Sequence, residues 1–379
     1  MRAYDAIVIG LGAMGSATLY HLARRGKRVL GIEQFSQGHQ LGSSHGDSRI
    51  IREQYFEHPL YVPLVQRAYD LWRELEEESG RPLMTLGGGL MIGPRDGMVV
   101  AGTLRSAKEY KLPHEVLSPS EVHRRFPAFE LADDLIAVVD PRAGYLDPEA
   151  CTSAHLTGAR ERGVEVHFDE PVTAWTADGD GVRVKTTNGD YVAERLLISA
   201  GAWTKELAED LNLPLTVERQ VAFWLEPDEY RVSYDSREFP IFAYEFTPGI
   251  LCYGFPRFPR GVKSSIMHAG ELTESPAEVR RTVNDDEVEA LRFALQPVLP
   301  GLASAPVSET SVCLFTNTPD HDFIIDFHPE HPQVLISSPC SGHGFKFASA
   351  LGEIHADLLE SGSTRLDISA FRIDRFKTT

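Results

Sequence analysis

The chain has 379 residues, 42% of them hydrophobic, and its 55 acidic residues outnumber its 37 basic residues to give a formal net charge of −18. This length and apolar content allow a large core and favour about two domains. The acidic balance argues against a nucleic-acid partner, which needs a basic face, and no apolar run is long enough to span a membrane.

The N-terminal segment has the pattern of a βαβ unit. Apolar runs at 6–9 and 28–32 predict two strands, and an amphipathic stretch at 16–25 predicts a helix between them. The glycine-rich turn Gly10–Gly15 joins the first strand to the helix, and the second strand ends at an acid, Glu33. This order and spacing are typical of a dinucleotide-binding unit.

Each residue type in this unit has a physical reason. Gly10 permits a tight turn, Gly12 lets a pyrophosphate approach the backbone, and Gly15 lets the helix pack closely against the sheet. The helix N-terminus offers free N–H groups to phosphates. Glu33, 18 residues after Gly15, can accept hydrogen bonds from a ribose and would repel a 2′-phosphate, which disfavours NADP. The motif alone leaves FAD and NAD open.

The remaining elements alternate between helical and extended patterns. As far as the middle of the chain we expect a polar loop, a helix, a glycine turn entering a strand and two further helices, at 36–47, 61–78, 86–93, 118–122 and 148–162. Strands with an Asn188-Gly189 hairpin turn follow, at 164–168, 172–175, 182–186 and 196–200. Residues 215–318 have the pattern of short antiparallel strands. Two more strands, a turn and a helix come last, at 323–326, 334–337, 341–346 and 347–359.

We therefore predict an α/β (α+β) fold in which one sheet is revisited along the chain. A Rossmann-like nucleotide domain would be assembled from residues 1–85, 145–214 and 320–379. Residues 86–144 and 215–319 would form a substrate domain on an antiparallel or mixed sheet. Assembly from separated segments is more common among FAD enzymes than among NAD dehydrogenases.

The cysteines further limit the kinds of site and the cell compartment that we expect. The chain has four, and they are widely spread, with no C-x-x-C pair and no metal-ligand spacing: Cys151, Cys252, Cys313 and Cys340. We expect no metal site and a reducing, cytoplasmic compartment.

A basic group follows the first glycine-rich loop. His45, Arg49 and Arg52 stand at positions i, i+4 and i+7, the spacing of one helix face. On the residues alone, this face could be solvated or could belong to a binding site.

Taken together, these passages resemble the monomeric sarcosine oxidase and N-methyl-tryptophan oxidase family, flavoproteins of the D-amino-acid-oxidase-like fold. The resemblance runs nearly end to end and implies bound FAD. It rests on five passages, which are Gly10–Glu33, Ser43–Arg52, Ile198–Trp203, Val312–Thr316 with Phe323–Asp326, and Ser341–Phe347.

The resemblance implies a flavin site that also holds a substrate carboxylate. It places His45 and Arg49 at the flavin ring. It places Arg52 and Lys346 on the carboxylate, where a planar guanidinium can bind both oxygens. The other cofactor contacts that it implies, besides the glycine turn and Glu33, are Ser44, Gly342, His343, Gly344 and Phe345.

The resemblance also implies a covalent flavin. In the family, the cysteine in the Val312–Thr316 setting forms a thioether with the flavin 8α-methyl group, so Cys313 is expected to tether the FAD. Such a bond needs a thiolate near positive charge. Cys340 is the rival, and Cys151 and Cys252 are expected to be packing residues.

The substrate side of the site departs from the family. Lys263 matches the family lysine that contacts the flavin through water and promotes reaction with O2, and Tyr253 matches an active-site aromatic. Four residues after this lysine the family has a histidine, whereas here Met267 takes that place and His268 follows. Because a one-residue shift in a strand reverses the side chain, either a bulge returns His268 to the site or Met267 replaces it. Phe315 stands where sarcosine oxidase has a tyrosine.

The expected activity is FAD-dependent oxidation of a secondary amine bearing a carboxylate, such as sarcosine or another N-methyl amino acid. The products would be an imine, then an aldehyde and an amino acid, with O2 reduced to H2O2. Alternatives are an oxidase of pipecolate-like, proline-like or fructosyl amino acids, or a dehydrogenase that avoids O2. A more remote alternative is a non-catalytic dinucleotide-binding sensor. The protein is expected to be a monomer without nucleic-acid or membrane partners.

Overall fold

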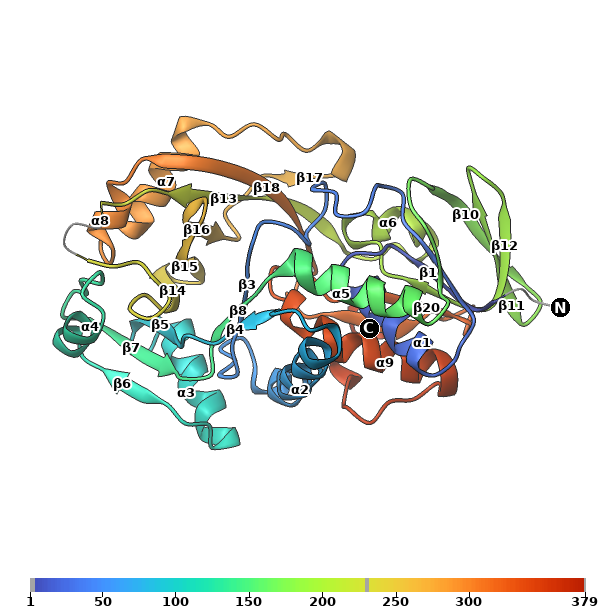
Figure 1. Ribbon diagram of the computed structural model, residues 1–379, viewed down its shortest axis with the longest axis horizontal. Coiled ribbons are helices and arrows are strands. Elements are labelled where there is room, and N and C mark those ends of the chain that lie inside the picture. Colours follow the sequence, from blue (N-terminus) through green and yellow to red (C-terminus); the bar gives the residue numbers. More distant parts are fainter. Residues whose placement is uncertain (1–3, 229–231, 378–379) are drawn as a thin grey trace.

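The computed structural model describes residues 4–228 and 232–377, and it places two large sheets side by side along the long axis of the molecule (Figure 1). In the first sheet, parallel pairing joins β1 to both β2 and β12, and β20 adds to β12. The described strands of this sheet are β1 (Tyr4–Ile9), β2 (Val29–Ile32), β9 (Glu165–His167), β10 (Val172–Asp178), β11 (Gly181–Thr186), β12 (Asp190–Ile198), β19 (Ile324–Phe327) and β20 (Val334–Ser338).

The alternation of side chains along β1 explains how the first sheet is covered. Ala6 and Val8 pack into a core with the helices α1 (Ala13–Arg24), α2 (Val62–Ser79), α5 (Pro148–Glu161) and α9 (Ala348–Ser361). Ile7 and Ile9 point to the other face, into a core that includes Val182 of β11. Because both faces are buried, β1 is an almost continuous apolar run.

The second sheet is mixed and mostly antiparallel. Its described strands are β5 (Gly89–Pro94), β6 (Glu115–Leu117), β7 (Leu135–Asp140), β13 (Thr216–Leu225), β14 (Ile241–Thr247), β15 (Ile250–Phe258), β16 (Gly261–Met267), β17 (Leu272–Thr273) and β18 (Val307–Asn317). Residues of α7 (Asp285–Leu295) and α8 (Pro300–Ala303) share a core with one face. Residues of α3 (Met98–Tyr110) share a core with the other face.

Smaller elements complete the fold. A short sheet is formed by β3 (Arg49–Ile51), β8 (Gly144–Leu146) and β4 (Met84–Thr85). The remaining α-helices among the described residues are α4 (Pro119–Arg125), which begins with a capping box at Ser118, and α6 (Thr204–Leu207). The mixed α/β architecture predicted from the sequence is confirmed.

Two local predictions were wrong. The helix after the glycine turn begins at Ala13 rather than at residue 16, because Gly12 is already its N-cap. Residues 45–52 form no helix: a loop leads into the strand β3, so the spacing of the basic side chains is not that of a helix face. β-branched Ile50 and Ile51 favour the extended conformation there.

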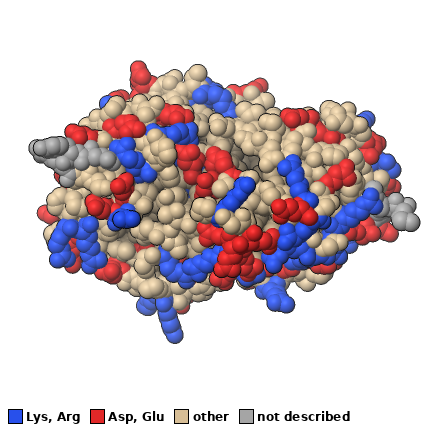
Figure 2. Space-filling model, viewed as in Figure 1, with Lys and Arg blue, Asp and Glu red and all other residues tan. Residues whose placement is uncertain are grey.

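The surface agrees with the charge balance of the chain. On the face shown in Figure 2, acidic and basic side chains are interspersed, and no continuous basic area is visible. Within residues 4–228 and 232–377, no helix has both the length and the apolar character that crossing a membrane would require.

Candidate active site

A cavity lies at the carboxyl end of β1, between the two large sheets, the position at which open α/β sheets bind ligands. Most of the site residues predicted from the sequence line it. These are Gly10, Gly12, Glu33, Ser44, His45, Arg49, Arg52, Tyr253, Lys263, Met267, Cys313, Gly342, His343, Gly344, Phe345 and Lys346. Gly15 and His268 are not among the lining residues.

The glycine turn packs too closely for side chains at two of its three glycines and tightly at the third. Gly10 has a φ of 85°, and a Cβ on it would lie 2.6 Å from the carbonyl oxygen of Ser199. A Cβ on Gly15 would lie 1.8 Å from the oxygen of Gly10. At Gly12 the nearest such neighbour is the Ser44 hydroxyl, at 3.2 Å. That hydroxyl accepts a hydrogen bond from the first N–H of α1, on Ala13, at 3.2 Å.

Glu33 supports the turn as well as facing the cavity. Its Oε2 accepts a hydrogen bond from the backbone N–H of Leu11 at 2.9 Å, and its Oε1 accepts one from Phe35 at 3.1 Å. Sequence reasoning expected a ribose contact here and missed the bond to Leu11. The carboxylate therefore joins the end of β2 to the glycine turn after β1.

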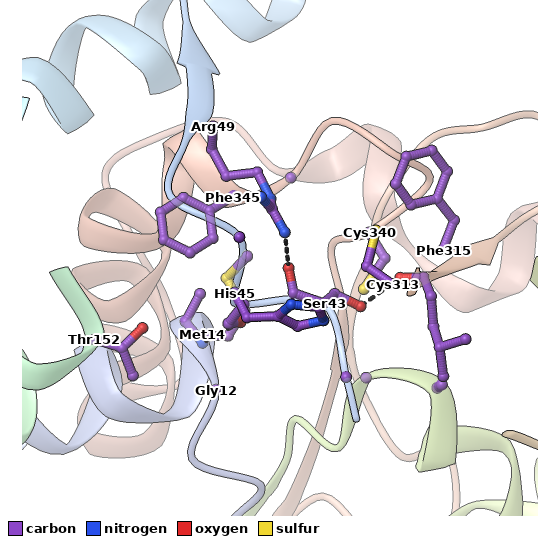
Figure 3. Close-up of a pocket in the computed structure, with 18 of the residues that line it drawn as sticks. Gly12, Met14, Ser43, His45, Arg49, Thr152, Cys313, Phe315, Cys340 and Phe345 are labelled. Atoms are coloured by element: carbon purple, nitrogen blue, oxygen red, sulfur yellow. Dashed lines mark hydrogen bonds between the residues drawn. The ribbon is translucent and has the colours of Figure 1, made fainter. Parts of the chain in front are cut away.

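The loop before β3 brings a histidine and an arginine to the cavity. Nη2 of Arg49 donates to the carbonyl of Ser43 at 2.6 Å, and its guanidinium carbon lies 6.0 Å from the Phe345 ring (Figure 3). His45 is buried, and its Nε2 has no hydrogen-bond partner among residues 4–228 and 232–377. Burial, and then the charge of Arg49, lowers the pKa of His45 to about 3, so its ring is neutral at physiological pH.

Arg52 is buried between two aromatic rings and paired with an acid. Its guanidinium carbon lies 4.2 Å from the centroid of the Tyr55 ring and 3.8 Å from that of Phe56. Nη2 donates to both carboxylate oxygens of Glu57, at 2.6 and 2.5 Å. Burial would raise the pKa of Glu57, but the charges of Arg52, His343 and Lys346 outweigh it and lower the pKa overall. Glu57 carried no signal in the sequence.

Lys346 approaches the same region from the turn before α9. Its Nζ donates to the carbonyl of His343 at 2.6 Å and lies 3.5 Å from the Tyr55 hydroxyl. Burial, followed by the charge of Arg52, lowers the pKa of Lys346 to about 7. Both ring nitrogens of His343 are used within the protein, by the Tyr55 hydroxyl at 2.5 Å and the His321 carbonyl at 3.0 Å. The His343 side chain is therefore a structural part of the cavity wall.

The turn itself depends on its glycines. Gly342 has a φ of 78°, in the left-handed region that glycine adopts most readily. A Cβ on Gly344 would lie 1.6 Å from the carbonyl oxygen of Pro339. These constraints carry the chain into the short 3₁₀ turn Phe345–Phe347, which places Lys346.

Two strands of the second sheet form the opposite wall. Nζ of Lys263 donates to the carbonyls of Gly46 and Ser48, at 2.5 and 3.0 Å, and within the described part of the chain no carboxylate contacts it directly. The Nζ also lies 5.0 Å from the Phe255 ring centroid. Tyr253, on the neighbouring strand, has its pKa raised to about 12, chiefly by burial.

The structure places Met267 in the cavity and His268 behind it. Lys263 and Met267 share one face of β16 because they are four residues apart on a strand. His268 follows with a φ of 59°, which ends the strand. Its Nδ1 lies 3.2 Å from Oε2 of Glu218, and its ring lies 4.4 Å from that of His321. No bulge returns His268 to the cavity wall.

Two cysteines line the same side of the cavity (Figure 3). Burial raises the pKa of Cys340 to about 11, which makes its thiol unreactive. Cys313 lies close enough to Lys263 and Arg281 to interact electrostatically with both. Cys151 and Cys252 are buried.

The chain is similar to proteins of known activity over nearly its whole length. Residues 5–358 match the model of the DAO family, described as FAD dependent oxidoreductase. A monomeric sarcosine oxidase of Streptomyces avermitilis is 44% identical over 372 residues, which cover 97% of this chain and 96% of that protein. An N-methyl-L-tryptophan oxidase of Yersinia pestis is 39% identical over 376 residues, covering 99% of this chain and all of the relative, 100%.

Solved structures share the fold. NikD, an amino acid oxidase of nikkomycin biosynthesis, superposes with a TM-score of 0.85 at 26% identity, covering 98% of each chain. L-proline dehydrogenase from P. horikoshii superposes with a TM-score of 0.85 at 22% identity, covering 99% of this chain and 98% of that one. At that identity the second likeness concerns the fold alone.

Proposed function

The chain belongs to the DAO family of FAD-dependent oxidoreductases, and from this premise we propose that it is an oxidase of N-methyl amino acids. The substrate would be a secondary amine that carries a carboxylate. The amine would lose two electrons and two protons to become an imine, O2 would take both to become H2O2, and water would hydrolyse the imine to an aldehyde and an amino acid.

The residues around the cavity fit an FAD. Gly12 lines the cavity as the N-cap of α1, and without a Cβ its backbone can be approached closely by a pyrophosphate at that helix N-terminus. Two buried polar atoms in the wall, Nε2 of His45 and Oγ1 of Thr152, have no partner among the residues that the structure describes and can bond a ligand. When bound, FAD would supply the electron acceptor, which the side chains of the protein cannot replace.

The observation that carries the proposal is the buried pair of cations, Arg52 and Lys346, at one end of the cavity. A cavity that only held a cofactor would not need both, whereas a substrate carboxylate can accept hydrogen bonds from each. In the structure Glu57 provides the carboxylate that Arg52 binds. A substrate would take its place, and its amine end would then extend toward Met267 and Tyr253.

The cavity wall formed by Met267 and Phe315 indicates which N-methyl amino acids fit. Met267 and Phe315 lie against Gly342, where a Cβ would come within 2.8 Å of the Met267 methyl group and 2.7 Å of the Phe315 ring. His268 and Glu218 are turned away. Because this wall is apolar, we propose that the substrate bears an apolar side chain rather than the single hydrogen of sarcosine.

Lys263 would serve the reaction with O2. Its ammonium lies at the cavity wall, fixed by backbone carbonyls rather than neutralised by a contacting carboxylate. A preorganised positive charge of this kind would stabilise the negative charge that develops as O2 accepts electrons. This assignment favours an oxidase over a dehydrogenase.

We propose further that Cys313, not Cys340, holds the FAD covalently. Cys313 lines the cavity close to Lys263 and Arg281, whereas burial keeps the Cys340 thiol protonated and unreactive. We assign residues 1–85, 145–214 and 320–379 to an FAD-binding domain and residues 86–144 and 215–319 to a substrate domain, with a shared cavity that takes Arg52 and Lys346 from the first and Cys313 from the second. A cytoplasmic monomer is the expected state, in accord with four cysteines that form no disulfide.

The test is a screen of the holoenzyme against sarcosine, N-methyl-L-tryptophan, N-methyl-L-leucine and pipecolate. Peroxide formed in equal amount to the aldehyde would support the oxidase. Reduction of a dye without peroxide would identify a dehydrogenase, and failure of every amine to bleach the flavin would leave a cofactor-binding sensor. Arg52→Ala is expected to raise the KM about a hundredfold, as for the loss of one partner in a buried ion pair.

A further inference from the structure

The ammonium of Lys263 is held by a three-residue turn. It donates to the Gly46 and Ser48 carbonyls, at 2.5 and 3.0 Å, and lies 3.2 Å from the Ser48 hydroxyl. The residue is 2% exposed. The position of the cation therefore depends on the conformation of the turn.

The turn is in a conformation that needs support. Gly46 has a φ of 96° and Asp47 a φ of 66°, and the second value lies in the left-handed region that residues with a Cβ adopt at a cost. Two carboxylates hold the turn, one from α5 and one from within the turn. Oε1 of Glu149, on α5, accepts from the N–H of Gly46 at 2.6 Å. The second carboxylate is that of Asp47 itself.

The Asp47 carboxylate fastens the turn to the second sheet. Its Oδ2 accepts from Nε1 of Trp224 at 3.0 Å and from Nε of Arg260 at 2.8 Å. Arg260 lies 3.9 Å above the Trp224 ring, and Nζ of Lys263 lies 5.5 Å from the same ring. Arg260 and Lys263 belong to one hairpin, β15–β16, so Asp47 joins that hairpin to the turn.

The same acid affects the charge of Lys263. Burial lowers the pKa of Lys263 well below its usual value, and the charge of Arg49 lowers it further. The negative charges of the carboxylates Asp47 and Glu149 act in the other direction. Removing the charge of Asp47 would therefore favour the neutral amine.

We propose that Asp47 is a positioning residue that keeps the Lys263 side chain in place and protonated at the cavity wall. The O2 arm of its test rests on the proposed oxidase function, whereas the titration of Lys263 does not. Asp47→Asn removes the charge and retains a side chain that tolerates the left-handed conformation. Glu309→Gln is the matched control, because Glu309 pairs with Arg260 at 2.5 Å from the side away from the turn.

The first measurement is the titration midpoint of Lys263. It is monitored by NMR of protein labelled with ¹³C at lysine Cε, and the Lys263 signal is assigned with Lys263→Met. Asp47→Asn is expected to lower the midpoint by about one pH unit, the size of effect that a nearby opposite charge produces. Glu309→Gln is expected to leave it unchanged. An unchanged midpoint in Asp47→Asn would overturn the proposal.

The second measurement separates the two half-reactions of the holoenzyme in a stopped-flow instrument. At a pH above the midpoint measured for wild-type Lys263, Asp47→Asn is expected to slow the reaction of substrate-reduced enzyme with O2 about tenfold, as a loss of one pKa unit predicts there, and to leave anaerobic reduction within about twofold. Equal slowing of both half-reactions would indicate general damage and contradict the positioning role. If the wild type itself fails to react with O2, the oxidase function fails, and the titration still decides the role of Asp47.

A second variant covers the case in which Asp47→Asn does not fold. Trp224→Phe keeps a ring beside Lys263 but removes the N–H that binds Asp47. It is expected to slow the O2 reaction about threefold, the size of effect of losing one ordinary hydrogen bond, because Asp47 keeps its charge and its bond from Arg260. If Trp224→Phe changes neither the Lys263 midpoint nor the rate of the O2 reaction, the proposal is contradicted.

Discussion

Glu57 binds the guanidinium of Arg52 through both of its carboxylate oxygens, at 2.6 and 2.5 Å from Nη2. The acid thus lies where the proposed function requires a substrate carboxylate. Substrate binding would replace one carboxylate on Arg52 by another, so affinity depends on how strongly Glu57 competes.

Removing the charge of Glu57 is expected to strengthen binding of a carboxylate ligand. Glu57→Gln leaves a neutral amide that binds Arg52 less well, so the Kd of a substrate-like carboxylate inhibitor should fall about fivefold, or about 1 kcal/mol. The check is a titration of the flavin absorbance with the inhibitor. Glu74→Gln, which alters a surface ion pair with Arg24, is the control. Weaker binding in Glu57→Gln would show that Glu57 supports the ligand instead of competing with it.

Binding of the same inhibitor is expected to weaken as the pH rises above about 7. Burial lowers the pKa of Lys346 to about 7, so the ammonium that would bind the carboxylate is lost above that pH. A bound carboxylate stabilises the ammonium and raises the pKa of Lys346 in the complex, so the affinity falls from about pH 7 up to that higher pKa and is constant above it. Lys346→Met should bind more weakly at pH 6 and show a flat profile from pH 6 to 9. A pH dependence that persists in Lys346→Met would assign the titration to another group.

Cys313→Ala is expected to release the flavin. After acid precipitation the wild-type pellet should be yellow, whereas the Cys313→Ala pellet should be colourless with the flavin in the supernatant. Cys340→Ala, at the second cavity cysteine, should retain a yellow pellet because burial keeps that thiol protonated. The reverse pattern would move the bond to Cys340, and free flavin from the wild type would exclude a covalent link.

Met267→His is expected to change substrate preference. The histidine would put a polar ring into the wall in place of Met267, beside Phe315 and Tyr253. The ratio of kcat/KM for N-methyl-L-leucine to that for sarcosine should fall about tenfold, the scale of discrimination of an apolar pocket. His268→Gln, behind the wall, should leave this ratio unchanged. A larger effect of His268→Gln than of Met267→His would show that the pair of His268 and Glu218, rather than Met267, determines the specificity.

The protein is expected to lose stability in mild acid. Burial lowers the pKa of His21 and of His355 to about 3, whereas an unfolded histidine titrates near about 6.5. The unfolded state therefore binds more protons between these values, and the free energy of unfolding falls as the pH drops through this window. Urea unfolding at pH 7.5 and pH 5.5 checks this. His355→Gln should reduce the difference, and equal midpoints at both pH values in the wild type would contradict the prediction.

Short-range patterns in the sequence determined the nucleotide-binding half of the site. The order of strand, glycine turn, helix and acid at residues 6–33 predicts β1, α1 and β2, because periodicity and glycine placement act locally. Local reasoning failed for residues 45–52, where helix-like spacing of charged residues occurs in a loop and a strand. Strand β3 is determined by its pairing with β8, about a hundred residues later, which no local pattern shows.

Only the tertiary structure decided which side chains meet in the cavity. The sequence left Met267 and His268 as alternatives, and the Glu218 contact and the left-handed backbone at His268 decided between them. Glu57 and Asp47 gave no sign of their partners in the sequence, since those partners are set by the packing of loops and strands. Short-range patterns determine the local elements because they depend on neighbouring residues. The charge and position of Arg52 and Lys263 depend on groups that only folding brings near.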